Sequence, residues 1–352
     1  MELREILVEA VKKQASDIFF VVGRKISFKI KGVIEAYGEH ILYKEDTITL
    51  IHDMYKLSDH RAMELCKEGD DDFALSIPDV GRFRVNVYRQ RGTFSAVLRV
   101  VVFELPAFEQ MGIPKQVINF STYTKGLVLV TGTSGSGKST TLSYLIDEIN
   151  KNRNCHIITL EDPIEFLHKH KNSIVSQREI GIDSINYSKA LRSAMRESPD
   201  VILIGEMRDL ETIEIAMTAA ETGHLVFSTL HTVGAANTID RIIDVFPPNQ
   251  QQQIRVQLGM VLKGIVSQQL LKSKESLIPA FEILMANNAV KNLIREGKIH
   301  QIDSVLSTSS KEGMVTMDQA ILELYKNGKI NQETALTYCT NQDTLRRNLS
   351  MN

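Results

Sequence analysis

The sequence has few cysteines and no long apolar run. Its three cysteines, Cys66, Cys155 and Cys339, lie far apart and form no CxxC pair. This excludes a disulfide framework and a cysteine-based zinc site, and it favours a reducing compartment. The longest apolar stretches, such as residues 201–205, are too short to cross a bilayer, and the first residues lack the apolar core of a secretory signal. We therefore expect a cytoplasmic protein that contacts a membrane only through partners.

Neither sign of charge is in excess. Lys and Arg number 41 against 43 Asp and Glu, which gives a formal net charge of -2 at pH 7. Such a balance gives no drive toward non-specific nucleic-acid binding, so we expect no nucleic-acid partner. With 352 residues, 43% of them hydrophobic, the chain is long enough for two or three domains with their own cores.

The pattern of apolar residues changes near residue 104. Before it, helical spacing predicts a helix over residues 2–14 and another near 48–57. Short strand-like segments punctuated by glycines accompany them, which predicts a small α+β domain over residues 1–104. The expected strands are 17–22, 26–30, 73–77, 82–88 and 93–101.

We place a linker at residues 105–120, where two prolines interrupt the pattern. Over 121–285, apolar strand candidates alternate with helical segments, which is typical of a parallel sheet covered by helices. Residues 286–352 are expected to form a helical C-terminal region. The expected strands are 127–130, 156–160, 201–204, 225–229 and, in a mostly helical stretch after Pro248, a short one at 280–284.

A phosphate-binding motif follows the first of these strands. Residues 132–139 read Gly-Thr-Ser-Gly-Ser-Gly-Lys-Ser, which matches GxxxxGK[ST], and a helical segment comes next. The glycines allow backbone N–H groups to converge on phosphate oxygens at the positive end of that helix. Lys138 would reach the β- and γ-phosphates of ATP, and the Ser139 hydroxyl would bind Mg²⁺. The predicted nucleotide-binding residues are Thr133, Ser134, Gly135, Ser136, Gly137, Lys138, Ser139 and Thr140.

Glu206 follows the apolar strand candidate at 201–204. In P-loop proteins a carboxylate at the end of such a strand holds Mg²⁺, here through water. Capping of the next helix is the simpler role for a carboxylate, but Asp209 is better placed to be that N-cap. We therefore predict that Glu206 is a catalytic, metal-associated residue.

Three further carboxylates, Glu161, Asp162 and Glu165, end another strand candidate. A carboxylate near the γ-phosphate could orient or deprotonate the attacking water. In an extended segment, Glu161 and Glu165 would share a face and Asp162 would point away. Spacing alone leaves open which of the three is the base.

His224 and His231 bracket the apolar strand candidate at 225–230. Their spacing puts them on opposite faces of a regular strand, so a shared metal is not expected. For His224, a solvated strand start remains an alternative to a functional role. His231 precedes a turn into a helix at the carboxyl edge of the sheet, where α/β proteins bind ligands. We interpret it as a γ-phosphate sensor or hydrogen-bond relay.

Three arginines of the first domain form another candidate group. Arg82 and Arg84 alternate with apolar residues along one strand, and Arg99 lies on the next. A solvated sheet face would explain them. A guanidinium cluster that binds nucleotide phosphate is the sharper alternative, with ATP held between domains or subunits.

Together, these motifs resemble the secretion and pilus ATPase superfamily and, within it, the type IV pilus retraction ATPases. The similarity extends from about residue 15 to residue 330 and is carried by residues 132–139, 159–165, 191–200, 205–209 and 224–235. The resemblance implies an α/β fold with a RecA-like P-loop ATPase domain after a PAS-like domain. It also implies a homohexameric ring in which ATP sits where the N-terminal domain approaches.

The resemblance also implies a role for each candidate residue. Lys138 and Ser139 become the Walker A pair, Glu206 the Walker B acid and Glu165 the catalytic carboxylate. The remaining residues become a histidine box and a set of nucleotide-facing arginines: His224, His231, Arg82, Arg84 and Arg99.

Residues 289–296, Ala-Val-Lys-Asn-Leu-Ile-Arg-Glu, resemble a signature of retraction motors, usually AIRNLIRE. Val290 and Lys291 depart from it. At helical spacing, an apolar side and a basic side that includes Arg295 lie apart. A plain packing helix is the alternative to a role in transmitting motion.

We therefore expect a hexameric motor that couples hydrolysis of ATP, with Mg²⁺, to type IV pilus retraction and twitching motility. Its expected partners are an inner-membrane platform protein and the pilus machinery, which would hold it at the inner face of the cell membrane. One alternative is a pilus assembly or type II secretion ATPase, or a retraction-accessory paralogue, although the CxxC insert usual in assembly ATPases is missing. Another is an ATP-binding regulatory module without motor activity, against which the presence of both Glu165 and Glu206 argues.

Overall fold

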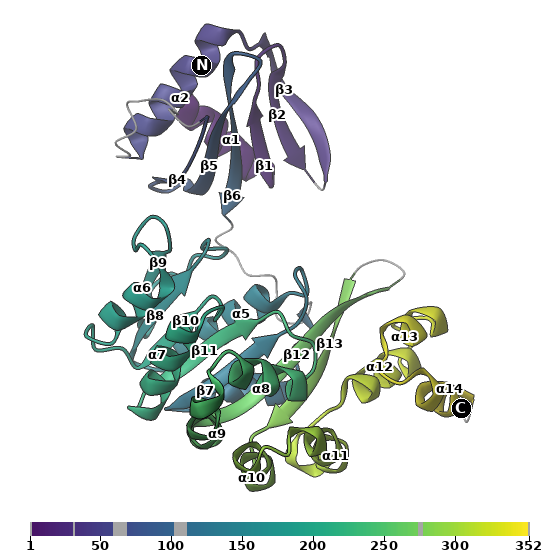
Figure 1. The fold of residues 1–352 in the computed structure, drawn as a ribbon. Helices are drawn as coiled ribbons and strands as arrows, with labels where there is room; N and C mark the ends of the chain where they lie inside the picture. Colours follow the sequence, from purple (N-terminus) through teal and green to yellow (C-terminus); the bar gives the residue numbers. More distant parts are fainter. Residues whose placement is uncertain (1, 31, 59–68, 102–110, 274–276, 351–352) are drawn as a thin grey trace. The chain divides into compact units, whose positions relative to one another are not determined.

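The computed structural model describes residues 2–30, 32–58, 69–101, 111–273 and 277–350 (Figure 1). Cys66 and the first part of the expected linker, residues 105–110, lie outside this range. The chain divides into two compact units, residues 1–104 with 165–167 and residues 105–164 with 168–352. Within the described residues, no helix has the length and apolar character needed to span a membrane.

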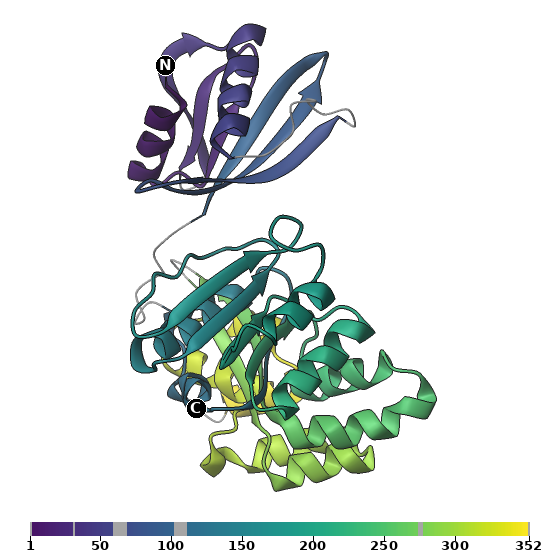
Figure 2. The ribbon, with the colours of Figure 1, turned by 90° about the vertical axis from the view of Figure 1, so that its left-hand side faces the viewer.

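The first unit is an antiparallel sheet with strand order β3-β2-β1-β6-β5-β4, packed against two helices (Figure 2). The alternation predicted along β5 is confirmed, because Phe83, Val85 and Val87 are buried in the core while the residues between them are half-buried. The elements are α1 (Leu3–Lys12), β1 (Asp17–Phe20), β2 (Lys25–Ile30), β3 (Val33–Ile41), α2 (Lys44–Leu57), β4 (Asp70–Ile77), β5 (Gly81–Gln90) and β6 (Thr93–Val101). Strand β3 was not predicted, because nearly all its residues are exposed and leave no buried alternation to detect.

The second unit is built on a sheet of order β13-β12-β7-β11-β10-β8-β9. All neighbours are parallel except β12 and β13, which pair antiparallel at one edge. The strands are β7 (Gly126–Thr131), β8 (His156–Glu161), β9 (Ile174–Glu179), β10 (Val201–Ile204), β11 (Leu225–Leu230), β12 (Leu262–Lys272) and β13 (Leu277–Met285). The predicted parallel sheet covered by helices is therefore confirmed.

Helices cover both faces of this sheet. Leu127 and Leu129 of β7 pack with the group of helices from α6 to α11, whereas Val128 and Val130 face α5. A third small core joins α12, α13 and α14 to the ends of β12 and β13. The helices are α4 (Lys115–Ile118), α5 (Lys138–Asn152), α6 (Tyr187–Ala194), α7 (Leu210–Glu221), α8 (Ala235–Asp244), α9 (Pro248–Val261), α10 (Asn288–Glu296), α11 (Ile302–Thr308), α12 (Met317–Lys326), α13 (Gln332–Tyr338) and α14 (Gln342–Ser350).

The expectation of a mostly helical stretch after Pro248 with only a short strand was wrong. Strand β12 follows α9 directly and runs from Leu262 to Lys272, and β13 is longer than the segment expected at 280–284. Strand β9 was also missed. In β12 the buried positions include Ser267 and Gln268, and polar residues at buried positions conceal a strand from any reading based on apolar periodicity.

Strand β12 passes close to a neighbouring aromatic ring at Gly264. A Cβ added there would lie 2.3 Å from Cζ of Phe120 and 2.8 Å from the carbonyl oxygen of Leu284. We expect Gly264→Ala to lower the free energy of unfolding by about 1–3 kcal/mol, the usual cost of overpacking a core, measured by urea titration. Gly259→Ala in α9 is the control and should cost less, because its nearest contacts lie at 3.2 Å and alanine favours the helix. Equal losses at both positions would contradict this account.

Candidate functional site

The phosphate-binding loop joins β7 to α5, and its backbone requires glycine. Gly132, Gly135 and Gly137 have φ angles of 142°, 76° and 88°, a region that side chains with a Cβ rarely adopt. Residues 133–135 are exposed at the tip, while Ser136 and Lys138 are buried. Lys138 Nζ donates hydrogen bonds to the carbonyl oxygens of Gly132 and Thr133, both at 2.9 Å. The lysine thus folds back over its own loop and binds two of its carbonyl oxygens.

Strand β12 supports this loop through Gln268, a residue that sequence reasoning missed. The buried Gln268 side chain accepts a hydrogen bond from Thr141 Oγ1 of α5 at 2.8 Å. A Cβ on Gly132 would lie 2.2 Å from the Gln268 carbonyl oxygen, and one on Gly137 would lie 2.8 Å from its Nε2. No sequence signal marks Gln268, because a glutamine in a long strand is ordinarily read as solvent-exposed.

Four parallel strands bring the candidate residues to one edge of the sheet. In the order β7-β11-β10-β8, the carboxyl ends carry the phosphate-binding loop, His231, Glu206 and Glu161. Ligands bind at this edge in open α/β sheets. His224 lies at the amino end of β11, where its Nδ1 is 2.9 Å from the carbonyl oxygen of Ala219. The structure therefore separates His224 from the loop of its own chain by roughly 20 Å, the length of the strand.

Glu206 and His231 contact each other, as neighbouring strand ends allow. His231 Nε2 lies 3.3 Å from Glu206 Oε2, and Arg208 Nη2 donates to Glu206 Oε1 at 2.7 Å. The Glu206 carboxylate is buried, so these two partners fix its orientation. Asp209 caps α7 by accepting from Thr212 N, which confirms the predicted N-cap and leaves Glu206 available for another role.

Tyr187 at the start of α6 completes the surroundings of Glu206 and was also missed. A Cβ on Gly205 would lie 2.7 Å from the Tyr187 hydroxyl. Burial, and to a smaller extent the carboxylates of Glu206 and Asp162, raise the pKa of Tyr187 above its usual range. The phenol therefore stays protonated at neutral pH and can donate a hydrogen bond beside the carboxylate.

The three carboxylates at the end of β8 and in the loop that follows lie in different surroundings. Glu161 is buried at the strand end, where its Oε1 accepts from Thr159 Oγ1 at 2.6 Å and from Gln177 Nε2 at 3.2 Å. The chain bends at Asp162, so the extended geometry considered for this segment does not apply. Asp162 and Glu165 are exposed. Glu161 is thus held by hydrogen bonds, and the two carboxylates beyond it face solvent.

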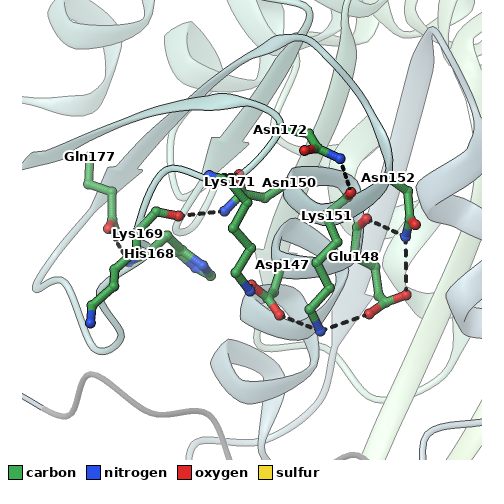
Figure 3. A network of polar contacts seen from close by, with 10 residues as sticks. All are labelled: Asp147, Glu148, Asn150, Lys151, Asn152, His168, Lys169, Lys171, Asn172 and Gln177. Carbon is green, nitrogen blue, oxygen red and sulfur yellow. Dashed lines mark hydrogen bonds and ion pairs between the residues drawn. The ribbon is translucent and has the colours of Figure 1, made fainter.

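The return of this loop is anchored on α5, the helix that begins at Lys138 (Figure 3). Asn150 of α5 is fully buried, donating to the carbonyl oxygen of Lys169 at 2.7 Å and accepting from Lys171 N at 3.1 Å. Asp147 forms ion pairs with Lys151 and Lys171 on the same side. The segment that follows the loop with Asp162 and Glu165 is therefore hydrogen-bonded and ion-paired to α5.

In the first unit the three candidate arginines share one face of the sheet. Arg84 and Arg99 are directly opposite each other on β5 and β6, and Arg82 lies two residues from Arg84 on the same side. Arg99 Nε donates to Asp17 Oδ1 at 3.1 Å, and Arg82 Nη1 donates to Ser76 Oγ at 3.3 Å. Partners within the unit thus orient the guanidinium groups of Arg82 and Arg99.

Comparison with known proteins gives one consistent result. The family described as Type II/IV secretion system protein matches residues 2–349. The chain is 41% identical over 336 residues to the type IV pilus retraction ATPase PilT of Pseudomonas aeruginosa, covering 95% of this chain and 97% of that protein. A crystal structure of the pilus retraction motor PilT with bound ADP superposes with a TM-score of 0.90 at 45% identity, covering 99% of each chain. The pilus assembly ATPase PilB of Myxococcus xanthus is 34% identical, over 68% of this chain and 43% of its own length.

Two glycines of the phosphate-binding loop should respond differently to alanine. Gly132→Ala adds a Cβ 2.2 Å from a backbone oxygen, whereas nothing lies within 4 Å of a Cβ at Gly135. Backbone strain from a positive φ, about 1–2 kcal/mol, is common to both. We expect Gly132→Ala to abolish ATP binding and Gly135→Ala to weaken it by about tenfold or less, measured by titration with a fluorescent nucleotide. Equal affinities would show that the contact with β12 does not shape the loop.

Proposed function

The chain belongs to the Type II/IV secretion system protein family, and we propose that it is the hexameric motor that draws type IV pili back into the cell. It is an ATP hydrolase of the P-loop class with a nucleotide-binding site. The observation that carries the proposal is the arrangement of the phosphate-binding loop, His231 and Glu206 on adjacent parallel strand ends. The near full-length match to a retraction ATPase, against a partial match to an assembly ATPase, favours retraction. We assign domain limits of 1–104 and 121–285, with a linker between them and a helical region at 286–352.

Residues 133–140 would hold the phosphates of ATP, with Lys138 at the β- and γ-phosphates. Within the described residues, Ser136 Oγ is buried without a hydrogen-bond partner, which suits a loop completed by a ligand. Magnesium is usually held by one or two protein groups together with substrate phosphates. Ser139 directly and Glu206 through water are the groups proposed here, and the ion would neutralise charge on the phosphates. His231, in contact with Glu206, would report the state of the γ-phosphate.

We assign the role of general base to Glu165 rather than to Glu161. Two donors already engage one oxygen of Glu161, and a carboxylate stabilised by hydrogen bonds is a weaker base. Glu165 is exposed and follows in the same loop. An exposed carboxylate is accessible to the water that it would deprotonate.

The test of this assignment is Glu165→Gln, which preserves the shape of the side chain and removes the base. ATP should bind normally while turnover falls about 10²-fold or more, the usual contribution of a general base. Lys138→Ala is the control for binding, since it removes the charge at the phosphates. Steady-state hydrolysis and nucleotide titration distinguish the two variants. Full activity in Glu165→Gln together with loss in Glu161→Gln would transfer the role to Glu161.

We propose that the chain assembles into a homohexameric ring. In this ring, Arg82, Arg84 and Arg99 would contact nucleotide phosphate. Guanidinium groups bind phosphate bidentately, and residues supplied in this way stabilise charge in the transition state. The ring would act with an inner-membrane platform protein and the pilus machinery. This would place the protein in the cytoplasm, peripheral to the membrane.

We propose that helix α10 transmits motion to a partner and takes no part in ATP hydrolysis. Val290 and Ile294 are buried against the core, while Arg295 is exposed and its Nη2 donates to Asn292 of the same helix. Arg295 thus belongs to no nucleotide motif and leaves its charge at the surface. A charge in this position can contact a neighbouring subunit or the pilus machinery without taking part in the chemistry.

Arg295→Ala should therefore form rings and hydrolyse ATP within about threefold of the parent, since surface substitutions rarely change stability by more than a few tenths of a kcal/mol. It should fail to restore pilus retraction in a strain that lacks the gene. Lys326→Ala, which removes an exposed cation from α12, is the matched control and should restore retraction. If Arg295→Ala also restores retraction, α10 is only a packing helix.

A further inference from the structure

Residues 162–167 form the loop that carries Asp162 and Glu165, and one side chain holds both of its ends. Gln177 of β9 accepts a hydrogen bond from the backbone N–H of His168 at 2.7 Å (Figure 3). The same amide donates through Nε2 to Glu161 Oε1 at 3.2 Å. The two residues that flank the loop are therefore joined through a single planar amide group.

A second residue of β9 supports the middle of the loop. Glu179 lies two positions after Gln177, so both side chains project from the same face of the strand. Glu179 is buried, and its Oε2 accepts from the backbone N–H of Ile164 at 3.4 Å. Strand β9 thus holds the loop at its beginning, its centre and its end.

Beyond the loop the chain is hydrogen-bonded to α5, the helix that begins at Lys138. Asn150 binds Lys169 and Lys171 through its buried amide. Burial lowers the pKa of His168 to about 4, so this residue is neutral at neutral pH and packs without a charge to hydrate. The contacts with β9 therefore act on residues 161–168, just before the segment that is hydrogen-bonded to α5.

We propose that Gln177 is a positioning residue for the hydrolysis step, acting through the loop that carries Glu165. The inference rests on the role proposed for Glu165. By joining Glu161 to His168, Gln177 fixes the separation of the loop ends and so restricts the positions open to the carboxylate between them. Displacement of a reacting group by about 1 Å can cost 10²-fold in rate, whereas phosphate contacts made by residues 133–140 do not depend on this loop.

The test is Gln177→Met, which preserves length and removes both hydrogen bonds. We expect kcat for ATP hydrolysis to fall about tenfold, a partial loss of positioning, while the Kd for ATP stays within about twofold of the parent. Ser176→Ala is the matched control. It removes a hydrogen bond to His156 on the opposite face of β9 and should leave kcat unchanged. Thermal unfolding of each variant verifies that the fold is intact.

A double-mutant cycle distinguishes positioning from general stability. In a Glu165→Gln background, Gln177→Met should leave the residual rate unchanged, because the group that it positions is already absent. A parental kcat in Gln177→Met, or the same fold loss in both backgrounds, overturns the proposal. Failure of the Glu165 assignment has a different signature, namely full activity in Glu165→Gln alone, in which case the same cycle with Asp162→Asn decides whether Gln177 positions this loop.

Discussion

The close contact between β12 and the phosphate-binding loop is the constraint on which the site depends. Gly132 and Gly137 both face Gln268, at distances that exclude a Cβ. The contact places the loop against the sheet, and the positive φ angles of Gly132 and Gly137 add a second requirement for glycine at these positions. Buried Gln268 also binds Thr141 of α5, so strand, loop and helix are joined by one side chain. A loop that is rigid before the ligand arrives binds with less loss of conformational freedom.

The rest of the site follows from strand order rather than from any single motif. Because β11 lies between β7 and β10, His231 is placed between the phosphate-binding loop and Glu206, although the three are far apart in sequence. The contact between His231 and Glu206 then links the carboxyl ends of two strands. The carboxyl ends of neighbouring parallel strands lie side by side at one edge of the sheet, so these residues need no unusual backbone conformation to meet.

The parts of the fold with strong apolar patterns could be predicted from the sequence, and the parts built on buried polar groups could not. Strands β7, β10 and β11 are buried throughout and mostly apolar, and the spacing of the glycines predicts the phosphate-binding loop. Strands β9 and β12 were missed because Gln177, Glu179, Ser267 and Gln268 occupy positions that apolar periodicity requires to be hydrophobic. The polar residues that made these strands hard to predict also support the loop of residues 162–167 and the phosphate-binding loop. For β9 and β12, unlike the exposed β3, the failure of pattern reading therefore coincides with the scaffold of the site, as expected where function overrides local preference.

One more polar residue connects the nucleotide edge with the C-terminal helices. Glu282 of β13 is opposite Ser267 of β12. Glu282 accepts a hydrogen bond from Ala235 N, and Ser267 accepts one from Gly234 N. Gly234 and Ala235 end the turn that follows His231. The second oxygen of Glu282 accepts from Met317 N at the start of α12. Burial raises the pKa of Glu282, and the two backbone donors oppose that shift. Two helix N-termini thus share one carboxylate, a favourable arrangement for its negative charge, and the turn that follows His231 is fixed to the same group as the first residue of α12.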